Sequence, residues 1–150
     1  MLKACIIISL LSLVLLIACQ SDEPKRKPLN PNGDSELAIL MRDMYDEGML
    51  VKQSVINGED PKMKLEYHHI NTATPTEDGK NATIEYQLFA KAYEASIERF
   101  KNASEAERPA AYQNMVDNCM GCHSKVCQGP MVRIKKMYLS EEELKLVKKG

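Results

Sequence analysis

Residues 112–126 read YQNMVDNCMGCHSKV, and this stretch places two thiols and an imidazole on the apolar face of a predicted helix. Its core-type and sulfur-bearing side chains recur at steps of three and four residues, the period of an α-helix. They are Tyr112, Met115, Val116, Cys119, Cys122, His123 and Val126. We therefore expect one helix whose last turns carry C-x-x-C-H toward the core.

The boundaries of this helix can also be predicted. Ser104 and Glu107 match a capping box, although Pro109 is tolerated only in a first turn, so the helix could start there instead. Gly129-Pro130 is typical of a helix end.

Two further amphipathic helices precede this one. The first is capped by Asp34 or Ser35 and stops at Asn57-Gly58, with apolar positions Leu37, Leu40, Met41, Met44, Val51 and Val55. The second runs from about Ala82 to Asn102, with Tyr86, Phe89, Ala90, Tyr93, Ile97 and Phe100 on one face. Residues 62–82 predict a short helix or a loop.

A short last helix is marked by Ser140 and Glu143, another capping box. No stretch alternates polar and apolar residues as a strand would. The sequence therefore predicts an all-α fold of the helical-bundle kind, with one short extra helix at the C-terminal end.

The N-terminal residues MLKACIIISLLSLVLLIAC predict export. One early lysine and an apolar run are typical of a secretory signal, and the residues before Cys19 resemble the bacterial lipobox, in which that cysteine is lipidated. We expect a signal peptide at 1–18, lipidated Cys19 with a flexible tether at 19–35, and a helical domain at 36–150. An ordinary signal peptide and an uncleaved anchor are the alternatives.

The tether does not decide which membrane face carries the protein. Residues 20–23, QSDE, look like a surface-export signal of Bacteroidetes lipoproteins, but they also suit a solvated tail in the periplasm. The outer membrane, its periplasmic face and the cell surface all remain open. The formal net charge of −1 gives no indication of nucleic-acid binding.

The spacing of Cys119, Cys122 and His123 is the c-type haem attachment signature. Two thiols one turn apart can reach the two vinyl groups of one porphyrin, and the adjacent imidazole can bind the iron. Zinc held by these residues and Cys127 is one alternative, and a redox or structural disulfide is another. Because the motif ends a helix and follows no strand, we favour covalent haem c, one per chain.

The chain resembles the cytochrome c-prime family, and in particular its low-spin branch, over about residues 36–126. The matching stretches are LMRD at Leu40–Asp43, Gly58-Glu59 with Pro61, and CMGCH. The resemblance implies a four-helix bundle in which Cys119 and Cys122 form the thioethers and His123 is the proximal iron ligand. It implies Met41 as the distal ligand, with Met44, one turn further along, as second choice.

Other sixth ligands stay open at this point. Met131 and Met137 follow the motif, and His68 and His69 are adjacent histidines in a polar stretch that we expect to face solvent. We interpret Cys127 as a buried packing thiol. The basic run Arg133, Lys135 and Lys136 predicts a solvated face, with haem propionates or an acidic partner as the alternative.

The sequence thus predicts a non-enzymatic, lipid-anchored, monohaem electron carrier with His/Met iron ligation. Its redox donor and acceptor proteins are not indicated, and it could be a monomer or a homodimer. The alternatives are a five-coordinate haem protein that binds or senses NO or CO, and a zinc-binding or structural lipoprotein.

Overall fold

The computed structural model describes residues 33–147, and all regular secondary structure in that range is helical. Three long helices, α2 (Glu36–Asn57), α3 (Ile84–Lys101) and α4 (Arg108–Lys125), are followed by short helices α5 (Met131–Ile134) and α6 (Glu141–Val147). Single 3-10 turns lie at η1 (Tyr67–Asn71), η2 (Lys80–Ala82) and η3 (Lys135–Met137). The all-α prediction is confirmed. The predicted signal peptide, Cys19 and nearly all of the tether lie outside the described residues.

The ends of α2 follow the predicted capping chemistry. The amide of Ala38 donates to the Ser35 hydroxyl oxygen at 3.2 Å, which satisfies one of the free N–H groups of the first turn. Gly58 ends the helix with φ +70°, a left-handed conformation that glycine adopts without strain, and its N–H donates to the carbonyls of Ser54 and Val55. Of the two predicted caps, Ser35 is therefore the one used.

Helix α4 begins at the second of its two predicted starts but ends earlier than predicted. Ser104 and Glu107 do form a box, with the Ser104 hydroxyl donating to Glu107 Oε2 at 2.5 Å, but they close a separate turn. The helix itself begins at Arg108 and accommodates Pro109 in its first turn, where no N–H is needed. It ends at Lys125, before Gly129-Pro130, because the chain after Val126 folds back over the last turn.

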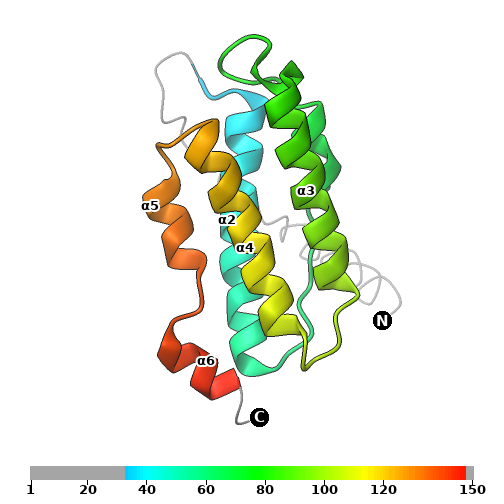
Figure 1. Cartoon of the computed structure of the whole chain (residues 1–150), viewed down its shortest axis with the longest axis vertical. Coiled ribbons are helices and arrows are strands. Elements are labelled where there is room, and N and C mark those ends of the chain that lie inside the picture. The colour runs from blue at the N-terminus through cyan, green and yellow to red at the C-terminus, as the bar shows by residue number, and fades with distance from the viewer. Residues whose placement is uncertain (1–32, 148–150) are drawn as a thin grey trace, which may run out of the picture. The chain divides into compact units, whose positions relative to one another are not determined.

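Helix α4 runs antiparallel to both α2 and α3 (Figure 1). The start of α2, the start of α3 and the end of α4 consequently lie at the same end of the helical domain, the upper end in the figure. The segment 58–83 returns from the end of α2 to the start of α3, mostly without regular structure apart from η1 and η2. This arrangement brings the predicted methionines and C-x-x-C-H to one end.

The core is formed by the predicted apolar faces. Its fully buried members include Tyr112 and Val116 of α4, each 0 % exposed, and Phe100 of α3. From α2, Leu37, Met44, Val51 and Val55 are buried, whereas Leu40 and Met41 are partly buried against the same cluster. The periodicity therefore identified the inward faces correctly, because a helix in a small domain can bury only one side.

The C-terminal segment packs back on α2 and α4. The Tyr112 hydroxyl donates to the carbonyls of Gly48 at 3.2 Å and Met137 at 2.9 Å. The ammonium of Lys52 contacts a carboxylate oxygen of Glu143 at 3.0 Å. The predicted box at the start of α6 is present, with the Ser140 amide donating to Glu143 at 2.7 Å. Within residues 33–147, no helix is long and apolar enough to cross a membrane.

We expect Tyr112→Phe to lower the free energy of unfolding by about 1–2 kcal/mol, because it removes a buried hydroxyl that donates to the carbonyls of Gly48 and Met137. Urea unfolding followed by circular dichroism measures the change. Tyr138→Phe is the control, since that hydroxyl donates at 2.9 Å to the exposed Asp117, and its removal should cost about 0.5 kcal/mol or less. Equal losses in the two variants would contradict this assignment.

Candidate functional site

Cys119, Cys122 and His123 occupy the last two turns of α4, and each is half-buried. The thiols face α3, because Cys119 interacts with the Tyr93 side chain and Cys122 interacts electrostatically with Tyr86. Gly121 lies between them against Phe89, whose ring carbon Cε1 would be 3.8 Å from a Cβ atom at that glycine. The motif therefore lies half-buried at the contact between α3 and α4 and not in the deepest part of the core.

Both thiols of the motif are protonated at neutral pH. Burial, followed by the neighbouring Cys122, raises the pKa of Cys119 to about 12, and the interaction with Tyr93 only partly opposes this. Burial also raises the pKa of Cys122 to about 11, together with the nearby Cys127 and Glu85. These are the properties of unreactive thiols, and not of a low-pKa redox pair that needs a thiolate.

The imidazole of His123 is held in one orientation. Its Nδ1 lies 2.8 Å from the backbone carbonyl oxygen of Cys127, and since a carbonyl can only accept, Nδ1 carries the hydrogen. Burial lowers the pKa of His123, which favours the neutral ring. The neutral tautomer with hydrogen on Nδ1 has its lone pair on Nε2, the form in which histidine binds a metal.

Cys127 does not pack in the core, and our interpretation of it as a buried thiol is wrong. Its side chain is exposed. The reason is that α4 has already ended and the backbone turns at Val126, so that the carbonyl of Cys127 points back to His123 and its side chain points outward. The contribution of this residue to the site is therefore made by its backbone.

The two methionines predicted as iron ligands lie in the first half of α2, and the start of α2 lies at the same end of the domain as the end of α4 (Figure 1). Met44 is buried, with 7 % of its surface exposed, and Met41 is partly buried beside it. Of the later methionines, Met131 starts α5, while Met137 is buried against Gly48 on the side of α2 that meets the C-terminal segment.

The remaining candidate residues lie on the surface. His68 and His69 are both exposed on η1, as expected, with ring centroids 4.5 Å apart. Arg133, Lys135 and Lys136 are exposed, as a solvated face requires. No cluster of three or more His, Cys, Asp or Glu side chains able to hold a metal ion occurs in the part of the chain that the structure describes. The alternative in which Cys119, Cys122, His123 and Cys127 hold zinc has no preformed ligand set.

Three aromatic residues of α3 belong to the site although sequence reasoning did not assign them to it. Tyr86, Phe89 and Tyr93 face the motif across the α3–α4 contact. They were predicted to lie on the inward face of their helix, but periodicity does not indicate which neighbour that face meets. Their position makes them the aromatic wall beside the two thiols.

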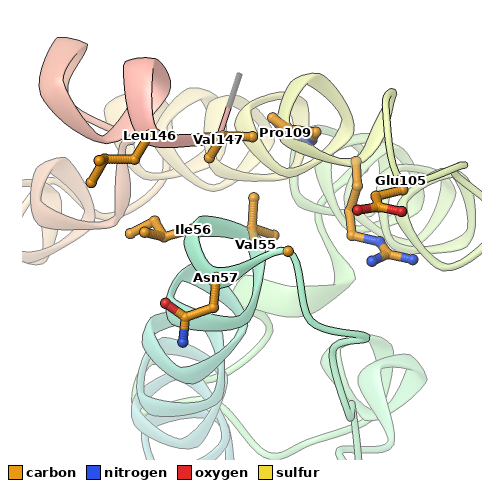
Figure 2. A pocket seen from close by; sticks show the side chains of 9 residues that line it. Val55, Ile56, Asn57, Glu105, Pro109, Leu146 and Val147 are labelled. Atoms are coloured by element: carbon orange, nitrogen blue, oxygen red, sulfur yellow. The ribbon is translucent and has the colours of Figure 1, made fainter. Parts of the chain in front are cut away.

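The domain also has a pocket at its opposite end, between the end of α2, the start of α4 and α6 (Figure 2). Val55, Pro109 and Leu146 contribute apolar atoms to it, and Glu105 and Arg108 lie at one side. Arg108 is already bonded to Asp60 at 3.2 Å. The pocket lies at the other end of the domain and takes no part in the site at Cys119.

Comparison of the chain with protein-family models, curated proteins and solved structures gives no match. The functional argument therefore rests on the residues and their geometry.

We expect the three cysteines of the helical domain, Cys119, Cys122 and Cys127, to differ strongly in reactivity in the haem-free protein. With a pKa of about 12, about one Cys119 thiol in ten thousand is ionised at pH 8, and burial slows its reaction further, whereas the Cys127 side chain is exposed. Alkylation by iodoacetamide, followed by peptide mass spectrometry, should modify Cys127 first and Cys119 last. In urea the order should disappear, and an order that persists there would show that burial is not its cause.

Proposed function

We propose that this chain is an exported, lipid-anchored c-type cytochrome that carries single electrons on one covalent haem and catalyses no reaction of its own. The observation that carries the proposal is the geometry of C-x-x-C-H at the end of α4. There, His123 is fixed by the carbonyl of Cys127 with Nε2 available as a ligand, and the two thiols lie one turn apart on the side facing α3.

The residues present suit a haem. Cys119 and Cys122 supply the two thiols that form thioethers, His123 supplies a neutral imidazole, and Tyr86, Phe89 and Tyr93 supply the aromatic surroundings that suit a porphyrin. The bound haem would supply an iron that cycles between two oxidation states. The protein's part is to hold it, to exclude water and to supply the axial ligands.

Met41 is our proposed sixth ligand, and Met44 is the second choice. Both lie in the first half of α2, at the end of the domain where α4 finishes. Methionine sulfur is a soft ligand that raises the iron potential relative to a second histidine. The exposed position of His68 and His69 supports methionine ligation over ligation by either histidine.

The helices also suit the resemblance to the low-spin cytochromes c-prime. If the chain has that fold, α2, α3 and α4 correspond to the first, third and fourth helices of the four-helix bundle. The segment 58–83, with only η1 and η2, takes the place of the second helix. We propose a bundle of this type in which one helix has been replaced by an irregular crossing.

Anchoring through Cys19 would keep the cytochrome at a membrane, where its redox partner proteins exchange electrons with it. The exposed residues Arg133, Lys135 and Lys136 suit an acidic patch on one such partner.

The decisive experiment is expression of the full chain in a bacterial host that matures c-type cytochromes. We expect covalent haem in denaturing gels, its loss in the double variant Cys119→Ala, Cys122→Ala, and a reduced spectrum that scarcely changes with carbon monoxide. A strong carbon monoxide response would instead support the open, gas-binding alternative. Zinc without iron in the purified protein would overturn the haem assignment.

The same preparations identify the sixth ligand. Replacement of the ligand, Met41→Ala or Met44→Ala, should convert the iron to a high-spin, carbon-monoxide-binding form, while the other variant keeps the low-spin spectrum. Met137→Ala is the matched control, because that methionine is buried on another side of α2. A low-spin spectrum in both single variants would exclude these two methionines.

We further expect the haem-free protein to be loosely packed. A domain of this size buries a modest core, and without haem the site between α3 and α4 would lose the packing contacts of the porphyrin. The double cysteine variant should therefore melt broadly and at lower temperature than the haem protein. Calorimetry and near-ultraviolet circular dichroism measure this. A cooperative melt as high as that of the haem protein would contradict the expectation.

A further inference from the structure

Glu47 is a buried carboxylate that the proposed haem chemistry does not yet use. It lies on the inward side of α2 with 8 % of its surface exposed. Its Oε1 accepts the backbone N–H of Lys64 at 2.6 Å and of Leu65 at 3.2 Å, and its Oε2 accepts the hydroxyl of Tyr67. Three hydrogen-bond donors therefore point at this carboxylate.

No cation neutralises this carboxylate. Among the described residues, no lysine or arginine forms an ion pair with Glu47. The neighbouring Lys52 pairs with Glu143, and Arg42 pairs with Asp34. The ammonium of Lys101 lies 5.8 Å from the centre of the Tyr67 ring and so approaches only the donor of Glu47. The negative charge is therefore held by dipoles alone, inside the domain.

Glu47 is directed toward the candidate site through two tyrosines. The Tyr67 ring meets the Tyr93 ring edge to face, with centroids 6.2 Å apart, and Tyr93 interacts with Cys119. The carboxylate also interacts electrostatically with Tyr93 itself. Tyr67 and Tyr93 thus lie between the carboxylate and Cys119, a thiol that would carry the haem.

The position of Glu47 on α2 also puts it near the candidate iron ligands of that helix. It is three residues after Met44 and six after Met41, so it lies about 4.5 Å and about 9 Å further along the helix axis than the two candidate iron ligands. Other ionisable groups face this region from the packed elements: Tyr67 of η1, Tyr93 of α3, and Tyr112 and Cys119 of α4. Glu85, at the exposed start of α3, acts on Cys122, so Glu47 is the buried carboxylate of this region and not its sole charge.

We propose, on the basis of the haem function argued above, that Glu47 is the residue that sets the reduction potential of the iron, holding it lower than a neutral side chain would. The oxidised iron carries one more positive charge than the reduced iron, so a nearby carboxylate stabilises the oxidised state more. In a buried, water-poor region this interaction is weakly screened. The same residue fastens the irregular segment 58–83 to α2, so one side chain serves fold and function.

The test is spectroelectrochemical titration of the full-length haem protein and its Glu47→Gln variant. Glutamine keeps an oxygen that can accept from Lys64 and Leu65 but removes the charge, and we expect the reduction potential to rise while the axial-ligand absorption bands stay unchanged. The shift should persist in high salt. An unchanged or lowered potential, with haem bound and the spectrum intact, would overturn the proposal.

Glu94→Gln is the matched control. That carboxylate also holds the η1 segment, by accepting from the side-chain amide of Asn71 at 2.8 Å, but it is only half-buried on α3. Its removal changes the net charge equally, and we expect a smaller potential shift that salt suppresses. Equal shifts in the two variants would show that net charge alone matters and would overturn the proposal.

Tyr67→Phe provides a second variant if Glu47→Gln folds poorly. It keeps the carboxylate and removes one of its donors, so the charge is less neutralised and we expect the potential to fall. A raised or unchanged potential in this variant would contradict the proposal. Absence of covalent haem from the wild-type protein would be a failure of the proposed function instead, and the two failures are therefore distinguishable.

Discussion

Helix α4 is the element on which the rest of the domain depends, because it packs against α2, α3 and the C-terminal segment at the same time. Its first half is fully buried at Tyr112 and Val116, and the Tyr112 hydroxyl joins α2 to the segment before α6. The buried first half therefore keeps the second half of α4 in place, although the second half is only half-buried. The candidate haem ligands lie on the less buried end of a helix that the other end has already fixed.

The second constraint comes from the irregular crossing between α2 and α3. A segment without regular structure leaves backbone N–H groups unpaired, and such groups are costly to bury. Glu47 satisfies two of them, and the carbonyl of Ile70 accepts the hydroxyl of Tyr86 at 2.7 Å. Side chains from α2 and α3 thus supply hydrogen-bond partners for backbone groups that a continuous second helix would have paired internally. The consequence is a buried carboxylate, Glu47, near the candidate site.

Much of the fold could be predicted because it depends on local chemistry. The helix-end signals each act within one helical turn; they are Ser35, Gly58 and the capping box at Ser140. The three apolar helix faces follow from the helical spacing of the apolar residues alone. The predicted start of α4 was less certain because two local signals, Ser104 and Pro109, compete within six residues. The structure uses both, the first for a separate turn and the second for the helix.

The features that could not be predicted all depend on which segments meet. Cys127 looked like a buried thiol because its spacing suits the helix before it, yet the helix ends first and only its carbonyl enters the site. Glu47 has nothing in the sequence that distinguishes it from the other acidic residues of α2. Its burial is decided by residues 64–67, which lie some twenty positions away and have no periodic pattern of their own.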